Sequence, residues 1–352
     1  MNNTLFVTGL QRIGIVVFWF ACLLGFLYAP ALLRVFHQER SLTIFTWPTI
    51  LDPQYLQKFE KETGIKLYIT YYESNQELFS KLQAGSASGY DLILPSDFTV
   101  KLMIQEGLVK KIDHSRLDFF SSLNKNLMGH YFDPNNDYSL PFFWGVYGIG
   151  INKNYFKDKP LPKADWGLLF NAQKEGYRVG MTDEAREAIL LAAFYLFGTI
   201  DITWSPENVD KIIALLTEQK KTVEAYTESR SEYLLTSDAV PVAYALSTDI
   251  YKAQAEYPQL DFLLPDAGSF IFIDSIVIPK NTTKDDMIYQ FINYLYGTAS
   301  LEHHTNLYGF CSPLEGAVNN TCSYQFDKLH FFENVVPQEL VNKIWITVMS
   351  KN

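Results

Sequence analysis

The residues with the clearest chemical signature are Phe272 and Asp274, in the stretch Ser269 to Pro279. This stretch is rich in β-branched and aromatic residues and follows Gly268, which predicts a β-strand. Alternate side chains of a strand share a face, so Asp274 and Phe272 point the same way in otherwise apolar company. An ionised carboxylate is costly there. Asp274 therefore faces water, pairs with an arginine of the protein, or binds a cation from outside, to which Phe272 offers a ring face.

A second acidic pair, Glu184 and Glu187, falls at the start of a helix predicted after Thr182. Residues three apart on a helix lie on one face about a turn from each other, so the two carboxylates could hold one cationic group between them. Acids in a first helical turn are also favoured by the helix dipole without any ligand. Arg186 can pair with its neighbours as well, so both interpretations stay open at this point.

Length and composition indicate a large, two-lobed protein. The chain has 352 residues, of which 48% are hydrophobic and 15% aromatic, more than one ordinary domain needs for its core. Its formal charge is −10, from 29 Lys and Arg against 39 Asp and Glu, with no basic cluster. This charge argues against nucleic acid as a partner and is compatible with a cationic ligand.

Residues 1–40 are predicted to direct export. The run from Ile13 to Leu33 contains no charge and is flanked by Arg12 and Arg34. Such a run is long enough to span a bilayer as an apolar helix and longer than the usual core of a signal peptide. An uncleaved membrane anchor and a cleaved signal peptide are both open.

The two cysteines of the exported part, Cys311 and Cys322, are eleven residues apart across a loop. In an oxidising compartment a disulfide is the expected state. No metal site is expected, because two cysteines without a nearby histidine fall short of a structural zinc set. The adjacent His303 and His304 point about 100° apart on a predicted helix, which favours solvated surface over a shared metal.

The chain after residue 41 alternates strands with helices. Strands are predicted at residues 42–47, 65–72 and 90–95. A helix should begin after Asp52-Pro53 and end at Gly64, another should begin at the capping box Ser74 to Glu77, and a third should follow Ser96. This alternation predicts an α/β fold with mainly parallel sheets, in which ligands bind beyond the carboxyl ends of the strands.

Two segments are predicted to cross between lobes. Residues 138–152 are apolar and contain Gly145, Gly148 and Gly150, which would admit a bend in the backbone. The strand 269–279 would be the return crossing. The predicted division is lobe 1 at 41–145 and 273–305, and lobe 2 at 146–272 and 306–352. Two crossings make a hinge and a central cleft, the geometry of a receptor that closes on its ligand.

A set of motifs follows in order along the chain: Trp47, Lys61 to Lys66, Tyr72 to Asn75, Tyr90 to Leu92, Pro95-Ser96, Phe132 to Ser139, Trp144-Gly145, Thr182 to Glu187 and Asp274-Ser275. Together these motifs resemble the spermidine/putrescine-binding proteins of bacterial ABC transporters. The resemblance covers residues 41 to 315 and implies a periplasmic binding protein of the type II kind, with two α/β lobes that close on a polyamine and deliver it to a membrane permease.

Carried over residue by residue, the resemblance implies a ligand site of three acids, four aromatic residues and a serine. Where the family pattern has a threonine and a tyrosine after the first pocket tryptophan, this chain has Pro48 and Ile50, which bears on the choice of polyamine. The implied ligand-binding residues are Trp47, Ser96, Phe98, Glu184, Glu187, Tyr244, Phe272 and Asp274.

The expected function is therefore solute binding in the periplasm, without catalysis or a cofactor, by a protein that is either free there or anchored to the inner membrane. Two alternatives are an exported hydrolase that uses paired carboxylates on a carbohydrate and a binding protein for another small solute. The sequence contains no nucleophile elbow, HExxH motif or glycine-rich phosphate loop, so nothing in it specifies a reaction. It does not distinguish putrescine from spermidine.

Overall fold

The computed structural model describes residues 19, 40–85, 89–227, 230–317, 322–333 and 335–351. Apart from Trp19, the apolar segment from Ile13 to Leu33, predicted to be a signal peptide or an anchor, lies outside the described residues. Over the described ranges we find no helix that is both long enough and apolar enough to cross a membrane.

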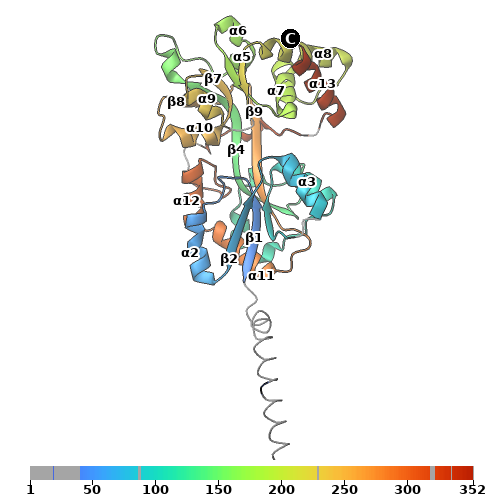
Figure 1. Ribbon diagram of the computed structural model, residues 1–352, viewed down its shortest axis with the longest axis vertical. Helices are drawn as coiled ribbons and strands as arrows, with labels where there is room; N and C mark the ends of the chain where they lie inside the picture. Colours follow the sequence, from blue (N-terminus) through green and yellow to red (C-terminus); the bar gives the residue numbers. More distant parts are fainter. Residues whose placement is uncertain are drawn as a thin grey trace, which may run out of the picture.

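The described chain forms two lobes joined by two long strands (Figure 1). The first lobe, below in Figure 1, contains the N-terminal elements and two helices from later in the chain. Its elements are β1 (Ser41–Thr46), α2 (Pro53–Thr63), β2 (Lys66–Tyr71), α3 (Asn75–Gly85), β3 (Leu92–Leu94), α4 (Asp97–Gln105), α11 (Asp285–Leu295) and α12 (Thr298–Tyr308).

The second lobe, above in Figure 1, is built from the middle of the chain and the C-terminal helix. Helix α13 packs against α7 and α8. The elements of this lobe are α5 (Gly167–Phe170), α6 (Ala172–Glu175), β5 (Val179–Met181), α7 (Ala185–Phe197), α8 (Pro206–Lys220), β6 (Val223–Tyr226), α9 (Ser231–Thr236), β7 (Val242–Leu246), α10 (Ser247–Gln254), β8 (Leu260–Leu263) and α13 (Gln338–Ser350).

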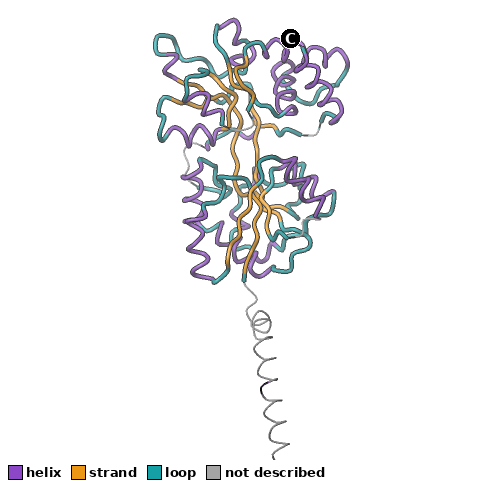
Figure 2. Tube along the Cα trace, viewed as in Figure 1, coloured by secondary structure: helices purple, strands orange, loops and turns teal. Residues whose placement is uncertain are grey.

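The two connecting strands are β4 (Ser139–Asn152) and β9 (Ser269–Val277), which pair antiparallel and run through both lobes (Figure 2). The strand order is β2-β1-β3-β9-β4-β7-β5-β6. The pairs within each end of this sheet, β2-β1-β3 and β7-β5-β6, are parallel. The structure is therefore the two-lobed α/β architecture predicted from the sequence, with the antiparallel pairs confined to the crossing strands and their neighbours.

Local sequence signals place the first-lobe elements as predicted. Asp52 is the N-cap of α2, where its carboxylate accepts a hydrogen bond from the Gln54 N–H at 2.9 Å. Gly64 ends the same helix in the left-handed conformation, with φ of 69°. Ser74 accepts a hydrogen bond from the Glu77 N–H at 3.2 Å at the start of α3, as expected for a capping box.

A buried aspartate fixes the entry into β4. Asp133 is 3% exposed, and its carboxylate accepts hydrogen bonds from the N–H groups of Tyr138 and Ser139, each at 2.8 Å. The Ser139 hydroxyl donates to the same oxygen at 2.8 Å. These bonds hold the turn before β4 in one conformation and so fix where the crossing strand begins.

The glycines of β4 have a different role from the predicted one. None of Gly145, Gly148 and Gly150 has a positive φ, and all three lie within a regular strand. Each instead leaves room for a neighbouring side chain. A Cβ on Gly145 would lie 2.7 Å from the ring of Phe272, its partner across the β4–β9 pair. The glycines admit close approach rather than a bend.

Two further observations concern the C-terminal part. Cys311 and Cys322, the cysteines predicted to pair, are joined by a disulfide with a Cα–Cα distance of 5.7 Å.

The expectation of solvated surface at the histidine pair is wrong. His304 is fully buried and donates from Nδ1 to the Ser300 carbonyl at 2.7 Å, and His303 hydrogen-bonds Asp52 at 2.8 Å. The bond to Ser300 lies within α12, and the bond from His303 joins α12 to the N-cap of α2.

We expect Gly145→Ala to destabilise the protein by about 1–3 kcal/mol, because the added methyl overpacks the ring of Phe272. The measurement is chemical denaturation of the variant and the wild type. In a Phe272→Leu background, Gly145→Ala should lower the free energy of unfolding by a smaller amount. An equal cost in both backgrounds would show that the ring of Phe272 is not the group that requires a glycine.

Candidate functional site

Asp274 lies on β9 in an environment with no compensating charge. Its side chain is 6% exposed and Phe272, two residues earlier, is 8% exposed. Among the residues that the structure describes, the Asp274 carboxyl has neither a hydrogen bond nor an ion pair. Burial, with a smaller contribution from the charge of Asp97, raises its pKa to about 8. Near neutral pH the carboxyl is therefore largely protonated when no cation is present.

Glu187, in the first turn of α7, is the acidic centre on the second lobe. Its carboxylate accepts hydrogen bonds at 3.1 Å from the hydroxyls of Tyr147, Thr182 and Tyr244. Burial and the charge of Glu184 raise the pKa of Glu187 to about 8, although the hydrogen bonds from the three hydroxyls act in the opposite direction. Within the described residues no lysine or arginine forms an ion pair with it.

Tyr147 of β4 connects the two acidic groups. Burial raises the pKa of its hydroxyl, and the charges of Glu187, Asp97 and Asp274 raise it further. All three carboxyls therefore lie near this one hydroxyl. The rings of Tyr244 and Phe272 each lie with centroids 5.6 Å from that of Tyr147, the first stacked and the second edge-on. The arrangement is a set of carboxyls walled by aromatic rings where the crossing strands meet both lobes.

The start of α4 brings Ser96, Asp97 and Phe98 to this region. The backbone of Ser96 forms an isolated bridge with Asp274. Ser96 occupies the N-cap position without a capping bond, since its hydroxyl donates to the Asn75 side chain at 2.7 Å instead. Phe98 is half-buried and lies under the Arg186 guanidinium, 5.5 Å from the ring centroid. One face of Phe98 is thus covered by a cation of the protein itself.

Glu184 and Trp47 lie further from the centre. Glu184 is the N-cap residue of α7 and is exposed, and loss of part of its solvent shell raises its pKa, with the charge of Asp183 adding to the rise. Trp47, at the end of β1, is half-buried and packs on Tyr72 with centroids 4.4 Å apart. Burial raises the pKa of Tyr72, and so does the charge of Asp274.

The family described as bacterial extracellular solute-binding protein matches residues 54–330, most of the chain. The chain belongs to this family.

Relatives with assigned ligands are similar over most of the chain. The spermidine/putrescine-binding periplasmic protein of Escherichia coli is 29% identical over 275 residues, which cover 78% of this chain and 78% of the relative. The putrescine/cadaverine-binding protein of Pseudomonas aeruginosa is 30% identical over 287 residues, or 79% of this chain and 80% of the relative. The resemblance inferred from the sequence motifs is confirmed.

A solved structure shows the same fold. The spermidine/putrescine ABC transporter substrate-binding protein of Streptococcus pneumoniae superposes with a TM-score of 0.76 at 22% identity, over 88% of this chain and 98% of that one. These relatives are solute-binding proteins, which confirms the expectation of a binding protein rather than an enzyme.

In this solute-binding protein, sequence reasoning missed two residues of the acidic region. Tyr147 lies in the predicted crossing segment, but nothing in its neighbourhood marks its hydroxyl as a partner of Glu187. The position of Asp97 directly after Ser96, at a predicted helix start, favours a helix cap or a charge at the rim of the site. Asp97 is instead 7% exposed and lies close enough to Asp274 to raise the pKa of that carboxyl. An aspartate directly after a capping serine was the available signal.

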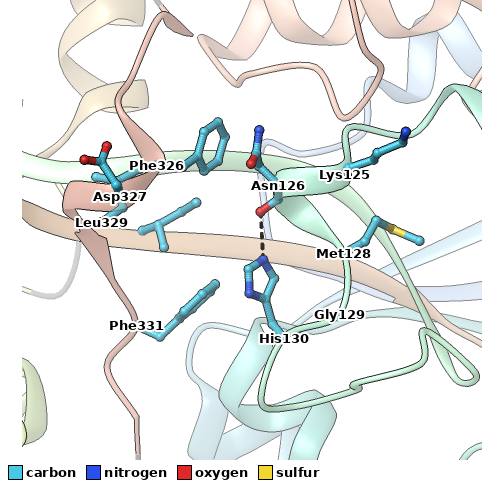
Figure 3. Close-up of a pocket in the computed structure, with 10 residues that line it drawn as sticks. Lys125, Asn126, Met128, Gly129, His130, Phe326, Asp327, Leu329 and Phe331 are labelled. Carbon is cyan, nitrogen blue, oxygen red and sulfur yellow. Dashed lines mark hydrogen bonds between the residues drawn. The ribbon is translucent and has the colours of Figure 1, made fainter.

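A separate pocket of about 460 Å³ lies on the other side of β9 (Figure 3). Ile271 lines it, and adjacent side chains of a strand point to opposite faces, so Phe272 points away from it. His130 donates from Nε2 to the Asn126 carbonyl at 2.9 Å within this pocket. None of the predicted ligand-binding residues lines it. The residues that do are Lys125, Asn126, Met128, Gly129, His130, Ile271, Phe326, Asp327, Leu329 and Phe331.

Asp274→Asn should raise the thermal stability of the ligand-free protein relative to the wild type by an amount that grows from pH 5 to pH 8. The pKa of Asp274 is about 8 when folded and about 3.9 when unfolded. The folded state therefore binds more protons over this range, and stability is lost as pH rises.

Melting temperatures of both proteins at several pH values test this. Asp113→Asn is the control, because hydrogen bonds from Ser115 hold the pKa of Asp113 below its usual range. It should show no such trend between pH 5 and 8. A constant difference between Asp274→Asn and the wild type over this range would contradict the assigned protonation of Asp274.

Proposed function

We propose that this protein captures a polyamine, putrescine or spermidine, in the periplasm and delivers it to the permease of an ABC importer. The observation that carries the proposal is the pair of acids, the buried Asp274 and the half-buried Glu187, that no cation of the described protein neutralises. A buried charge is stabilised only by a partner. A small ligand with ammonium groups at its ends supplies such partners.

The rings around the acids suit the rest of such a ligand. A polyamine has methylene groups between its ammonium groups, and these need apolar walls. Tyr147, Tyr244 and Phe272 offer such walls, each within ring-contact distance of another. A ring face beside an ammonium group contributes roughly 0.5–2 kcal/mol. Micromolar affinity or better, about −8 kcal/mol, is then attainable after the cost of ordering the ligand.

The ligand-binding residues proposed are those carried over from the family pattern, with unequal roles. Asp274 and Glu187 bind ammonium groups. Tyr244 and Phe272 contact methylenes, and Trp47, Ser96, Phe98 and Glu184 line the approach. The relatives support this proposal, since the Escherichia coli protein is named for spermidine and putrescine and the Pseudomonas aeruginosa protein for putrescine and cadaverine. Both sets of ligands are short chains with amine ends.

We predict that Asp274→Ala and Glu187→Ala each lower the affinity for putrescine and spermidine about tenfold or more, because each removes a charged hydrogen-bond partner. Titration calorimetry gives the affinity and circular dichroism checks the fold. Glu184→Ala should have a smaller effect, since Glu184 is exposed. Unchanged affinity in both of the first two variants would remove the site assignment.

Affinity should fall as the pH is lowered from 8.5 to 6. Protons compete with the ligand for Glu187 and Asp274, whose pKa values are each about 8. The terminal amines of the ligand, with pKa values near 10 like that of lysine, stay largely charged over this range. Calorimetric titrations across the range measure the trend. Affinity that is constant or rises toward pH 6 would show that the buried carboxyls do not bind the ligand in ionised form.

Ligand identity can be read directly. Native mass spectrometry of the protein, purified without denaturation, should detect bound putrescine or spermidine. An amine-free solute such as a sugar would replace this proposal with that of a binding protein for that solute. Turnover of a glycoside in a substrate screen would instead favour the hydrolase alternative.

Delivery to a permease requires that the two lobes be recognised together. We expect the permease to contact both lobes only when they are closed on ligand, because a partner that favours one conformation must bind it more tightly. Cross-linking to permease-containing membranes should therefore be stronger with polyamine than without it. Equal yields with and without polyamine would contradict this mode of delivery.

A further inference from the structure

Asp97 is a buried acid that is not among the ligand-binding residues carried over from the family pattern. It is the first residue of α4 and is 7% exposed. Its carboxyl accepts hydrogen bonds from the backbone N–H groups of Phe98 and Ile273 and, at 3.2 Å, from the hydroxyl of Tyr131. The bond to Ile273 places Asp97 beside the backbone of β9 at the residue immediately before Asp274.

Two further observations bring Asp97 and Asp274 together. The backbone of Ser96 bridges to that of Asp274. The charge of Asp97 is also the second cause, after burial, of the raised pKa of Asp274. The two carboxyls belong to different elements, the start of α4 and the crossing strand, yet lie close enough to repel each other when both are ionised.

The groups facing Asp97 do not neutralise it. Tyr131, from the chain before β4, offers a hydroxyl. Glu333, in the C-terminal segment, adds a further negative charge. Two cations lie in this region, and neither forms an ion pair with Asp97 in the described part of the chain. Arg186 of α7 lies over Phe98 and donates to the Val336 carbonyl at 3.1 Å, and Lys101 of α4 lies 4.9 Å from the ring centroid of Tyr131. Burial raises the pKa of Asp97 to about 7.

We propose that Asp97 is itself a ligand-binding residue that forms, with Asp274, a two-carboxyl site for one ammonium group of the ligand. The inference rests on the proposed polyamine function and extends it. An ammonium group has three N–H donors. The Asp274 carboxyl is more than nine-tenths buried and has no partner in the described part of the chain. One ammonium group can satisfy it and the remaining acceptor positions of Asp97 together.

The proposed site then has two carboxyls at one end of the ligand and one carboxyl at the other. Asp97 and Asp274 bind one end of the ligand from the first lobe and β9. Glu187, with its three hydroxyl donors, binds another amine from the second lobe. A ligand with amines at both ends bridges the lobes, whereas a monoamine engages one of them. Ligand binding also releases protons near neutral pH, because an ammonium group favours the ionised form of each carboxyl.

The competing explanation is that Asp97 only fastens α4 to β9, with its charge favoured at the helix N-terminus. Asp97→Asn separates the two. The asparagine oxygen can still accept the hydrogen bonds from Phe98 and Ile273, but the charge that attracts an ammonium group is gone.

The experiment is titration calorimetry of the full chain with putrescine and with spermidine, in two buffers of different ionisation enthalpy at pH 7. We expect Asp97→Asn to lower the affinity for the better ligand roughly tenfold, the loss expected for a hydrogen bond between charged groups. The variant should also release fewer protons per ligand bound. Asp249→Asn is the matched control. Burial and the charge of Glu232 raise the pKa of Asp249 to about 7 as well, but it lies on α10, and its loss should change neither quantity.

Unchanged affinity and unchanged proton release in a folded Asp97→Asn variant would overturn the inference. If that variant does not fold, the carboxyl carbon of Asp97 in the wild type decides. Its NMR shift at pH 7 should move to the ionised value on addition of putrescine, and an unmoved signal in saturated protein would also overturn it. Failure of the wild type to bind either amine would count against the polyamine function itself, which a lost effect at Asp97 alone would not.

Discussion

The structure depends on carboxyl groups buried without a cation at the place where two strands pass between the lobes. Ionised, such groups are costly; protonated, they are tolerable. The aromatic residues beside them make the cost larger, because Tyr147, Tyr244 and Phe272 exclude water. The free-energy cost is therefore greatest when the carboxyls are ionised and no cation is bound, and a bound cation would lower it. Glu187 accepts hydrogen bonds from three hydroxyls of the protein, whereas Asp274 accepts none in the described structure, so under the proposed function its partner would come from the ligand.

Such a site needs a rigid support, and the β4–β9 pair provides it. Asp133 fixes the start of β4, and Gly145 lets the ring of Phe272 lie across the neighbouring strand. Both strands continue into both lobes, so the residues they carry belong to one paired unit, whereas residues at the starts of α4 and α7 belong to one lobe each. If the lobes close on a ligand, as proposed, these helix starts would approach a common centre on the strands.

Much of this could be predicted from local patterns. Alternation placed Phe272 and Asp274 on one face of a strand, and Asp52, Pro53 and Gly64 marked a helix with both of its ends. The predictions that failed were those that depend on contacts between residues distant in the sequence. The glycines of β4 indicated a bend, since the sequence does not say which side chain lies over each. Asp97 suggested a helix cap, because its neighbour Asp274 is 177 positions away. Tyr147 carried no signal, since its partner Glu187 belongs to another element. His304 was predicted to be solvated, because the sequence does not show that α2 packs over it.

The disulfide between Cys311 and Cys322 has a consequence for how the protein matures. The backbone of Cys311 pairs with Trp144 of β4, and the chain after Cys322 forms β10 (Leu329–His330), which adds to β9. It then delivers Phe332 onto Phe270, with ring centroids 3.9 Å apart, and to within 5.0 Å of Tyr147. The segment that places Phe332 beside Tyr147 is therefore fastened to β4 through the Cys311–Cys322 disulfide, which forms only where thiols are oxidised. A chain still in a reducing environment lacks that fastening, so a fully assembled binding surface would arise after export and not before it.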